Sequence, residues 1–280
     1  MRLAQLRKIG TRITLYTVLV VWLAIFMVPV AWMVLSSLKT DEEIIRAGIE
    51  FLPRQLMWQN YADVWRGVPF NRYIFNSTVV AVTTTVINVL ISSMAGYGLA
   101  KFQFFGRKLI FLFILSSIMV PFQVMMIPLF ILAKNFGFLN SLHGLIIPTA
   151  VTAFGVFLMR QTIVQIPNDF ADSARIDGCS EVQIYWHVIL PLARVAAITL
   201  VVLHFLGSWN DLIWPLLIVF KDEFTTLPLA LTRLQGDWQF GFRYERLMSV
   251  AVIMSVPVVA LYAVFNRFIT RGITVGGLKG

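Results

Sequence analysis

Residues 13–35 read ITLYTVLVVWLAIFMVPVAWMVL and contain no charged side chain. An α-helix needs roughly 20 apolar residues to cross a hydrocarbon core of about 30 Å, so this run predicts a membrane-spanning helix. Four basic residues precede the run: Arg2, Arg7, Lys8 and Arg12. A secretory signal peptide also begins with basic residues, but its apolar core is only roughly 7–15 residues long. We therefore predict an uncleaved membrane anchor.

The composition of the whole chain requires more than one such helix. Of the 280 residues, 58% are hydrophobic and 13% are charged, about half the charged fraction of a soluble domain. Further apolar segments follow at Tyr73–Ala100, Leu109–Ala133, His143–Met159, Val195–Phe220 and Leu247–Asn266, and Asp211 interrupts Val195–Phe220. They are otherwise continuous and do not alternate with polar residues, which indicates helices and excludes a transmembrane β-barrel. The predicted fold class is an all-α polytopic membrane protein with six transmembrane helices.

The basic residues predict the orientation of these helices. More of the 23 Lys and Arg residues fall on the inside when the N-terminus is cytoplasmic, as the positive-inside rule requires. The excess is small, and the reverse orientation stays open. The predicted order begins with a cytoplasmic tail 1–12, a first helix 13–35 and an external loop 36–72. A five-helix core 73–268 and a cytoplasmic tail 269–280 follow. The core includes a cytoplasmic polar loop, 165–191, between the fourth and fifth helices.

The second apolar segment is unusually polar for a membrane span. It contains Asn76, Ser77, Thr83, Thr84, Thr85, Asn88, Ser92 and Ser93. Such side chains favour close helix contacts and hydrogen bonds between helices, so the segment should face protein or water and not lipid. Either a buried helix of the bundle or a pore-lining helix fits this pattern.

Several kinds of chemistry are absent from the sequence. The single cysteine, Cys179, excludes an internal disulfide and a metal site built from several cysteines. No phosphate-binding GxxxxGK[ST] loop is present, and no nucleophile–base arrangement stands out. His143 and His204 fit structural roles. We therefore predict no catalytic residue, no metal and no cofactor. The net charge of +9 reflects basic residues that flank membrane spans, so no nucleic-acid partner is expected.

The polar loop 165–191 reads QIPNDFADSARIDGCSEVQIYWHVILP. Asp169 is expected to cap a short helix, and Asp172 follows three residues later as in a capping box. Gly178 permits a left-handed turn that ends this helix. A second short helix should span Ser180–His187, and Leu190-Pro191 should open the fifth membrane helix, because proline is tolerated in a first turn.

The spacing of this loop resembles the Glu-Ala-Ala loop of ABC importer permeases. That motif is followed by a glycine after three residues and by Ile-x-Leu-Pro after nine more. Here Asp172, Ser173 and Val188 replace Glu, Ala and Ile, and the spacing is intact. In that family the loop is where a separate ATPase docks, so the resemblance implies a coupling role for Asp172, Ser173, Ala174, Arg175, Asp177, Gly178, Leu190 and Pro191. Residues 165–191 are hereafter the coupling loop.

The resemblance extends over nearly the whole chain and is closest to the second permease subunit of carbohydrate importers of the maltose-transporter type. It is carried by Asn60-Tyr61, Pro69-Phe70, Arg72-Tyr73, Asn76-Ser77, Gly96 to Phe102, Pro121, Ile127 to Leu129, Gly137, Leu139 to Ser141, Trp209 to Asp211, Arg271-Gly272 and Gly276 to Gly280. It implies three kinds of protein partner: a homologous second permease subunit, two ATP-binding cassette ATPase subunits, and an external solute-binding protein.

Trp209, Asn210 and Asp211 lie within the predicted fifth span. A charge there costs about 2.5–3.5 kcal/mol, so Asp211 should face the bundle or a wet cavity. With Asn76 of the second span, these residues are candidates for a substrate pathway, since a Trp beside hydrogen-bonding groups suits a sugar ring. A hydrogen-bonded clamp between helices is the alternative.

The sequence thus predicts a non-enzymatic, multi-pass permease subunit of an ATP-driven importer in the bacterial inner membrane, with both termini cytoplasmic. The resemblance to the carbohydrate branch implies a sugar or oligosaccharide as substrate. A permease for an amino acid, phosphate or polyamine is an alternative, as is a structural membrane subunit. A secondary transporter would show ionisable pairs at the membrane midplane and inverted repeats, and we find neither.

Overall fold

The computed structural model describes residues 2–46, 50–236 and 243–276. Helices connected by turns and loops make up these ranges, which contain no strand, in agreement with the predicted all-α class. Met1 of the predicted N-terminal tail, residues 47–49 of the predicted external loop and residues 277–280 of the predicted C-terminal tail lie outside the described residues. The chain divides into two compact units, unit 1 (Met1–Phe70 and Leu231–Val256) and unit 2 (Asn71–Ala230 and Pro257–Gly280).

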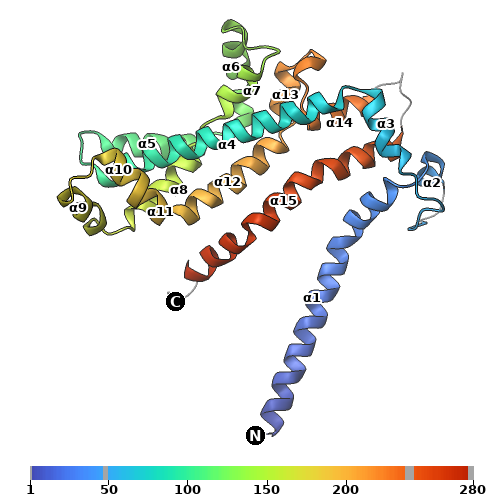
Figure 1. Cartoon of the computed structure of the whole chain (residues 1–280), viewed down its shortest axis with the longest axis horizontal. Helices are drawn as coiled ribbons and strands as arrows, with labels where there is room; N and C mark the ends of the chain where they lie inside the picture. The colour runs from blue at the N-terminus through green and yellow to red at the C-terminus, as the bar shows by residue number, and fades with distance from the viewer. Residues whose placement is uncertain (1, 47–49, 237–242, 277–280) are drawn as a thin grey trace. The chain divides into compact units, whose positions relative to one another are not determined.

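Unit 1 is built around the end of its first helix. Its helices are α1 (Arg2–Ser36), α2 (Asp41–Ile45), α3 (Gln59–Gly67), the end of α14 (Leu227–Gly236) and the first part of α15 (Tyr244–Gly276) (Figure 1). The Asn60 amide donates to the carbonyl oxygens of Ser37 at 2.9 Å and Lys39 at 2.8 Å. The buried Lys39 ammonium donates to the Glu50 carbonyl and lies 4.4 Å from the centre of the Trp32 ring. These bonds satisfy the backbone where α1 ends.

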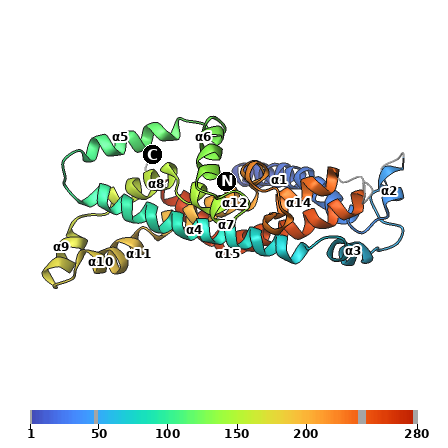
Figure 2. The same ribbon diagram turned by 90° about the horizontal axis from the view of Figure 1, so that it is seen from above.

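Unit 2 contains the remaining helices. They are α4 (Phe70–Lys101), α5 (Arg107–Ile118), α6 (Phe122–Asn135), α7 (Leu142–Ile146), η1 (Ile147–Thr149), α8 (Ala153–Val164), α9 (Asp169–Ile176), α10 (Glu181–Ile184), the π-helical turn η2 (Tyr185–Ile189), α11 (Leu190–Leu192), α12 (Arg194–Trp209), α13 (Ile213–Ile218), η3 (Asp222–Phe224), the start of α14 (Leu227–Gly236) and the end of α15. The helices α9 and α10 project at the C-terminal end of α4 (Figures 1 and 2).

Three helices are long and apolar enough to cross a membrane singly: Thr11–Ser36, Phe70–Lys101 and Tyr244–Asn266. Three bent pairs pass the same test together: Arg107–Ile118 with Phe122–Asn135, Leu142–Thr149 with Ala153–Val164, and Glu181–Leu192 with Arg194–Trp209. If each bent pair makes one span, the described residues hold six spans, the predicted number. None of the residues in the most apolar stretch of Thr11–Ser36 is buried by the described chain, so lipid or a partner must cover that stretch.

The third and fourth predicted segments each contain a bend that the sequence analysis did not predict. In the third, α5 and α6 meet at a bend of 101°. Pro121 lies at this break, where it has no N–H to donate and disfavours a helical Val120 before it. In the fourth, α7 and η1 meet α8 at 43°, and the Thr152 hydroxyl accepts from the Gly155 N–H at 3.1 Å to cap the new helix.

The predicted fifth segment, Val195–Phe220, is divided, and the predicted opening of its helix at Leu190-Pro191 was wrong. The helix α12 begins at Arg194 and not at Leu190, after a bend of 78° that separates it from the short α11. It ends at Trp209, and α13 starts only at Ile213. Asp211 lies in this break, and its Oδ1 accepts from the backbone N–H of Ile213 at 3.1 Å and of Trp214 at 3.4 Å. A side chain that takes these donors competes with a continuous helix.

Close packing of α4 against the start of α8 depends on Gly155. A Cβ atom at Gly155 would lie 2.5 Å from Ser92 Oγ and 2.8 Å from Asn88 Oδ1, whereas one at Gly98 would meet nothing within 4 Å. Gly155→Ala should therefore destabilise unit 2 by about 1–3 kcal/mol, as overpacking of a core does. Gly98→Ala should be neutral or slightly stabilising, since alanine favours a helix. Thermal unfolding in detergent measures both, and equal melting temperatures for the two variants would contradict the packing.

Candidate functional site

The coupling loop is a helix, a tight turn and a second helix, as predicted. Gly178 has φ +84°, the left-handed conformation that favours glycine. The Cys179 N–H donates to the Ala174 carbonyl at 3.0 Å, and the Gly178 N–H donates to the Arg175 carbonyl at 3.0 Å. This pair of bonds is the Schellman pattern that closes a helix C-terminus. The predicted turn at Gly178 is confirmed.

The predicted start of α9 was wrong. The helix begins at Asp169 with Asn168 as its cap residue, and no side chain of the cap bonds to the first turn. The Asn168 Oδ1 instead accepts from the Lys101 ammonium at 2.8 Å, so it is engaged elsewhere. A capping box occurs at the next helix, α10, where Ser180 and Gln183 bond reciprocally.

Arg175 holds the two helices of the coupling loop together. Its Nη1 donates to Asp172 Oδ1 at 2.6 Å and its Nε donates to Glu181 Oε1 at 2.7 Å. The Tyr97 hydroxyl of α4 donates to the other Glu181 oxygen at 2.6 Å. Hydrogen bonding to Glu181, followed by that to Asp172, raises the pKa of the Arg175 guanidinium, so it stays charged at physiological pH. These bonds fix the loop rigidly to α4.

Apolar packing also holds the coupling loop against the neighbouring helices of unit 2. Ala171, Ala174, Ile184 and Ile189 are buried in one cluster with Tyr97, Met159 and Leu200. Ala174 therefore packs in this cluster, while the Ser173 hydroxyl bonds back to the Asp169 carbonyl at 2.7 Å. The other predicted coupling residues lie at element ends: Asp177 is the C-cap of α9, and Leu190 and Pro191 form the first turn of α11.

Three exposed apolar side chains on α9 and α10 of the coupling loop were missed in the sequence. Ile176 is 87% exposed, Val182 66% and Phe170 51%. They sit on α9 and α10, the polar segment that the sequence places outside the membrane. An apolar side chain this exposed outside lipid is a candidate contact with another protein. The sequence contained a signal for them, because these apolar residues lie in a polar segment outside the predicted spans.

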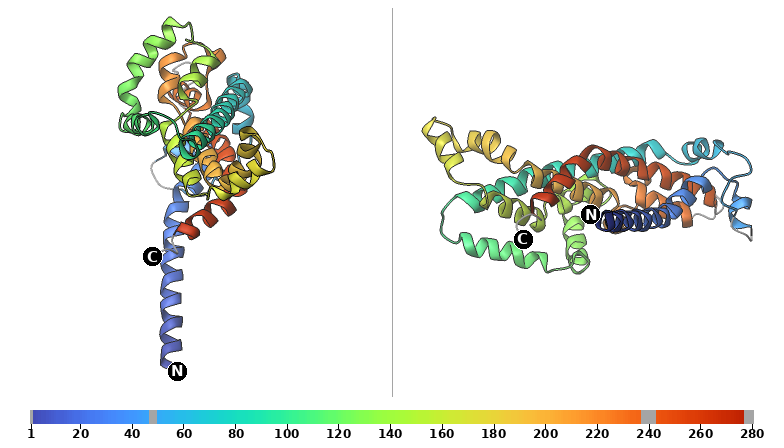
Figure 3. Two further views of the ribbon diagram at one scale, coloured as in Figure 1. Left: turned by 90° about the vertical axis from the view of Figure 1, so that its left-hand side faces the viewer. Right: turned by 90° about the horizontal axis from the view of Figure 1, so that it is seen from below.

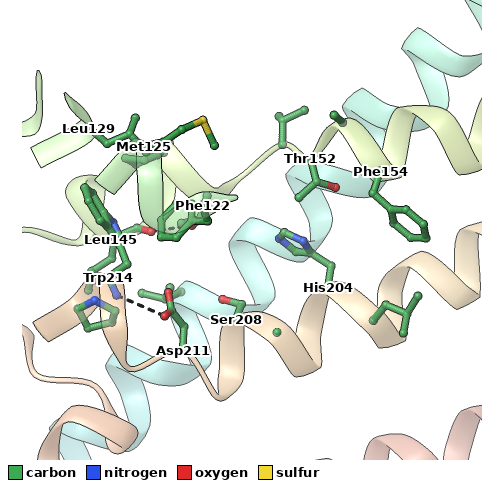
Figure 4. A pocket seen from close by; sticks show the side chains of 18 of the residues that line it. Phe122, Met125, Leu129, Leu145, Thr152, Phe154, His204, Ser208, Asp211 and Trp214 are labelled. Carbon is green, nitrogen blue, oxygen red and sulfur yellow. Dashed lines mark hydrogen bonds between the residues drawn. The ribbon is translucent and has the colours of Figure 1, made fainter. Parts of the chain in front are cut away.

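A second candidate site is a cavity of about 670 Å³ within unit 2 (Figure 4). It is lined by Ser77, Val80, Ser117, Ile118, Val120, Phe122, Met125, Leu129, Leu145, Pro148, Thr149, Val151, Thr152, Ala153, Phe154, Leu203, His204, Gly207, Ser208, Asp211, Trp214, Pro215 and Thr226. The breaks in the third, fourth and fifth predicted segments all contribute lining residues. The cavity therefore lies where the helices are interrupted.

Asn88 on α4 supports one wall of this cavity. Its Oδ1 accepts from the Ser92 hydroxyl at 2.8 Å and from the Thr152 backbone N–H at 3.3 Å. Because a backbone N–H only donates, this contact identifies which amide atom is the oxygen. The Asn88 Nδ2 therefore donates to Thr152 Oγ1 at 3.2 Å and to His204 Nδ1 at 2.6 Å. A neutral His204 that accepts at Nδ1 carries its hydrogen on Nε2.

Of the four predicted pathway residues, only Asp211 lines the cavity. The Asn76 amide instead donates to the carbonyl oxygens of Glu223 at 3.0 Å and Thr225 at 2.9 Å, which is the clamp alternative. Trp209 is buried and stacks on Phe205 with ring centres 5.7 Å apart. Asn210 is exposed and its side chain bonds to the Leu206 carbonyl. Among the described residues, no three His, Cys, Asp or Glu side chains are placed to hold a metal ion.

Comparison with known proteins places this geometry in a family. Residues 88–275 match the model of the family described as binding-protein-dependent transport system inner membrane component. That match covers more than half of the chain, so the chain belongs to this family of membrane components of transport systems. It is a translocation subunit and not an enzyme, and the resemblance noted in the sequence is confirmed.

Relatives are similar over nearly their full length. The arabinooligosaccharides transport system permease protein AraQ of Bacillus subtilis is 37% identical over 91% of this chain and 92% of its own. The diacetylchitobiose uptake system permease protein NgcG of Streptomyces coelicolor is 30% identical over 94% of this chain and 88% of its own. The sn-glycerol-3-phosphate transport system permease protein UgpE of Yersinia enterocolitica is 26% identical, over 94% and 96% of the two chains.

A solved structure has the same fold. It is the crystal structure of a bacterial ABC transporter involved in the import of the acidic polysaccharide alginate, and one of its chains superposes with a TM-score of 0.82. The match covers 91% of this chain and 95% of that chain at 24% identity, so it carries the fold alone. The chain is thus a helical, multi-pass inner membrane component.

Gly178 gives a test of the loop geometry. Gly178→Val should distort the turn, because a β-branched residue in the left-handed region costs at least about 1–2 kcal/mol. Gly178→Asn is the matched control, since asparagine tolerates this conformation. Space is not limiting, because a Cβ atom at Gly178 would meet nothing within 4 Å. Proteolysis rates of the loop in purified protein should rise for valine and not for asparagine, and equal rates would contradict a conformational role.

Proposed function

We propose that the chain is the membrane-spanning permease subunit of an ATP-driven importer for a sugar or oligosaccharide. It would act with a homologous second permease subunit, two ATPase subunits and an external solute-binding protein. In this assembly the coupling loop is cytoplasmic, both termini are cytoplasmic, and six spans cross the lipid bilayer. The order of segments is the one predicted from sequence, and the third, fourth and fifth spans are each a pair of helices that meet at a bend.

The coupling loop is the observation that carries this proposal. It is braced internally by Arg175 and externally by Tyr97, yet it exposes Ile176 and Val182. The sequence has no phosphate-binding loop of its own, so a chain that moves solute with ATP must receive that energy from another subunit. The coupling loop, held in shape by these bonds and exposing apolar side chains, is suited to transmit the movement of such a subunit to α4 and α12.

The relatives support sugar as the substrate class. AraQ is named for arabinooligosaccharides and NgcG for diacetylchitobiose, and both share at least 30% identity with this chain. The competing class is a phosphorylated polyol, because UgpE is named for sn-glycerol 3-phosphate. The proposal follows the two more similar relatives.

Cys179 tests the orientation. It is the single cysteine of the chain, it is exposed, and it lies in the coupling loop. A membrane-impermeant maleimide should therefore label it in inside-out vesicles and leave it unlabelled in intact spheroplasts. Cys179→Ser should abolish the labelling, which controls for other reactive groups. Labelling from the outside would place the coupling loop on the wrong side for an ATPase.

Ile176 tests docking of the ATPase subunit. Ile176→Asp places a charge where we expect an apolar contact, so copurification of the ATPase subunit and ATP-dependent uptake should fall at least about tenfold, as truncation of a binding hot spot does. Ile176→Met keeps an apolar side chain of similar size and should retain both activities. Because Ile176 is exposed, neither variant should change the melting temperature of the isolated chain. Normal copurification of the aspartate variant would remove Ile176 from the interface.

A further inference from the structure

The cavity of unit 2 is large enough to hold a small molecule. It has about 670 Å³ of space, within the roughly 300–1,000 Å³ range of small-molecule sites. We infer that this subunit has its own site for an uncharged sugar ring in this cavity, in addition to whatever site its partner subunit provides. This inference rests on the proposed function, because it specifies the chemical class of the solute and where this chain holds it.

Two buried polar atoms of lining residues have no partner among the described residues. They are His204 Nε2 and Thr226 Oγ1. The contact of His204 Nδ1 with Asn88 makes Nε2 a hydrogen-bond donor. Polar atoms that are buried without a partner destabilise a fold unless something bonds to them. Both atoms are closed off from the open space of the cavity, so they add polarity to its wall without offering a direct contact to an occupant.

The walls of the cavity also match a sugar. Phe122 and Phe154 give apolar aromatic surface, while Ser208 and Asp211 give oxygen atoms (Figure 4). Asp211 uses Oδ1 for the backbone of α13, and Oδ2 has no partner among the described residues. A lipid acyl chain would fill the same volume but would leave Asp211 Oδ2 without a partner, so it fits less well than a hydroxylated ring.

The charge of the cavity selects against anions. Asp211 is the one formally charged side chain among the described lining residues. Charges interact more strongly in surroundings of low dielectric constant than in water. A phosphate, carboxylate or sulfonate in this cavity would therefore be repelled, with no basic lining residue to offset the repulsion. One acidic lining residue and no basic one therefore favour a neutral sugar over an anionic solute.

Gly207 allows a direct test on the assembled transporter in native membranes. It lines the cavity, and a Cβ atom there would meet nothing within 4 Å. In a Cys179→Ser background, Gly207→Cys should react with small methanethiosulfonate reagents. After correction for their rates with free thiol, the cationic reagent should react at least tenfold faster than the anionic one. Adding Asp211→Asn, which keeps the Oδ1 acceptor, should reduce that ratio to about one.

Sugar protection and a steric block complete the test. Uptake of arabinotriose, diacetylchitobiose, lactose and sn-glycerol 3-phosphate is first compared in cells with and without the gene. The neutral sugar that depends on the chain should slow modification of Gly207→Cys at least tenfold. Gly207→Trp should lower its uptake at least tenfold with unchanged assembly. Gly98→Cys and Gly98→Trp are the matched controls, because Gly98 also has open space within 4 Å but does not line the cavity.

The outcomes separate the two proposals. If chain-dependent uptake of a neutral sugar is found but Gly207→Cys is unreactive, unprotected or indifferent to reagent charge, the cavity is not a sugar site while the proposed function stands. Normal uptake by assembled Gly207→Trp has the same meaning. If only sn-glycerol 3-phosphate depends on the chain, or none of the four solutes does, the sugar assignment fails and this inference fails with it.

Discussion

The side-chain amide of Asn88 is the contact on which the arrangement of unit 2 depends. It bonds to the start of α8 through Thr152 and to α12 through His204. In apolar surroundings each of these polar groups is costly unless it has a partner, so the bonds specify which faces of the three helices meet. Gly155 makes this possible, since any larger residue would push α8 off Asn88. The coupling loop and the cavity are both built on the helices joined here.

Much of the fold could be predicted because its signals are local. Apolar length predicted the helices Tyr73–Ala100 and Leu247–Asn266, which match the long helices α4 and α15. The same signal could not show the bend between α5 and α6, since the residues at that break are as apolar as those along the helices. Pro121 and Asp211 marked two of the breaks, but a proline or an acid is tolerated within some spans. Whether it breaks one depends on the helices packed around it.

In the candidate sites, too, some features could be predicted from the sequence and others could not. The turn at Gly178 could be predicted, because a left-handed residue at a helix end has a local preference for glycine. The N-cap could not be assigned correctly, since the Lys101 side chain, far away in sequence, engages Asn168. The cavity depends on segments from residue 77 to residue 226 and on interruptions that sequence did not reveal. Polarity within the second span did signal a buried network, and Asn88 proved to be its centre.

In the coupling loop, the charged side chains and the exposed apolar side chains have different roles. Asp172 and Glu181 share one guanidinium, so a basic side chain of a partner would compete with Arg175 for either carboxylate. Exposed ion pairs contribute only about 0–1 kcal/mol, and exchanging one for another gains little. Burial of Ile176 and Val182 gains more, at about 25 cal/mol per Å² of apolar surface removed from water. We therefore infer that the acidic residue of the motif sets the shape of the coupling loop through Arg175, and that the apolar side chains would supply the affinity for an ATPase subunit.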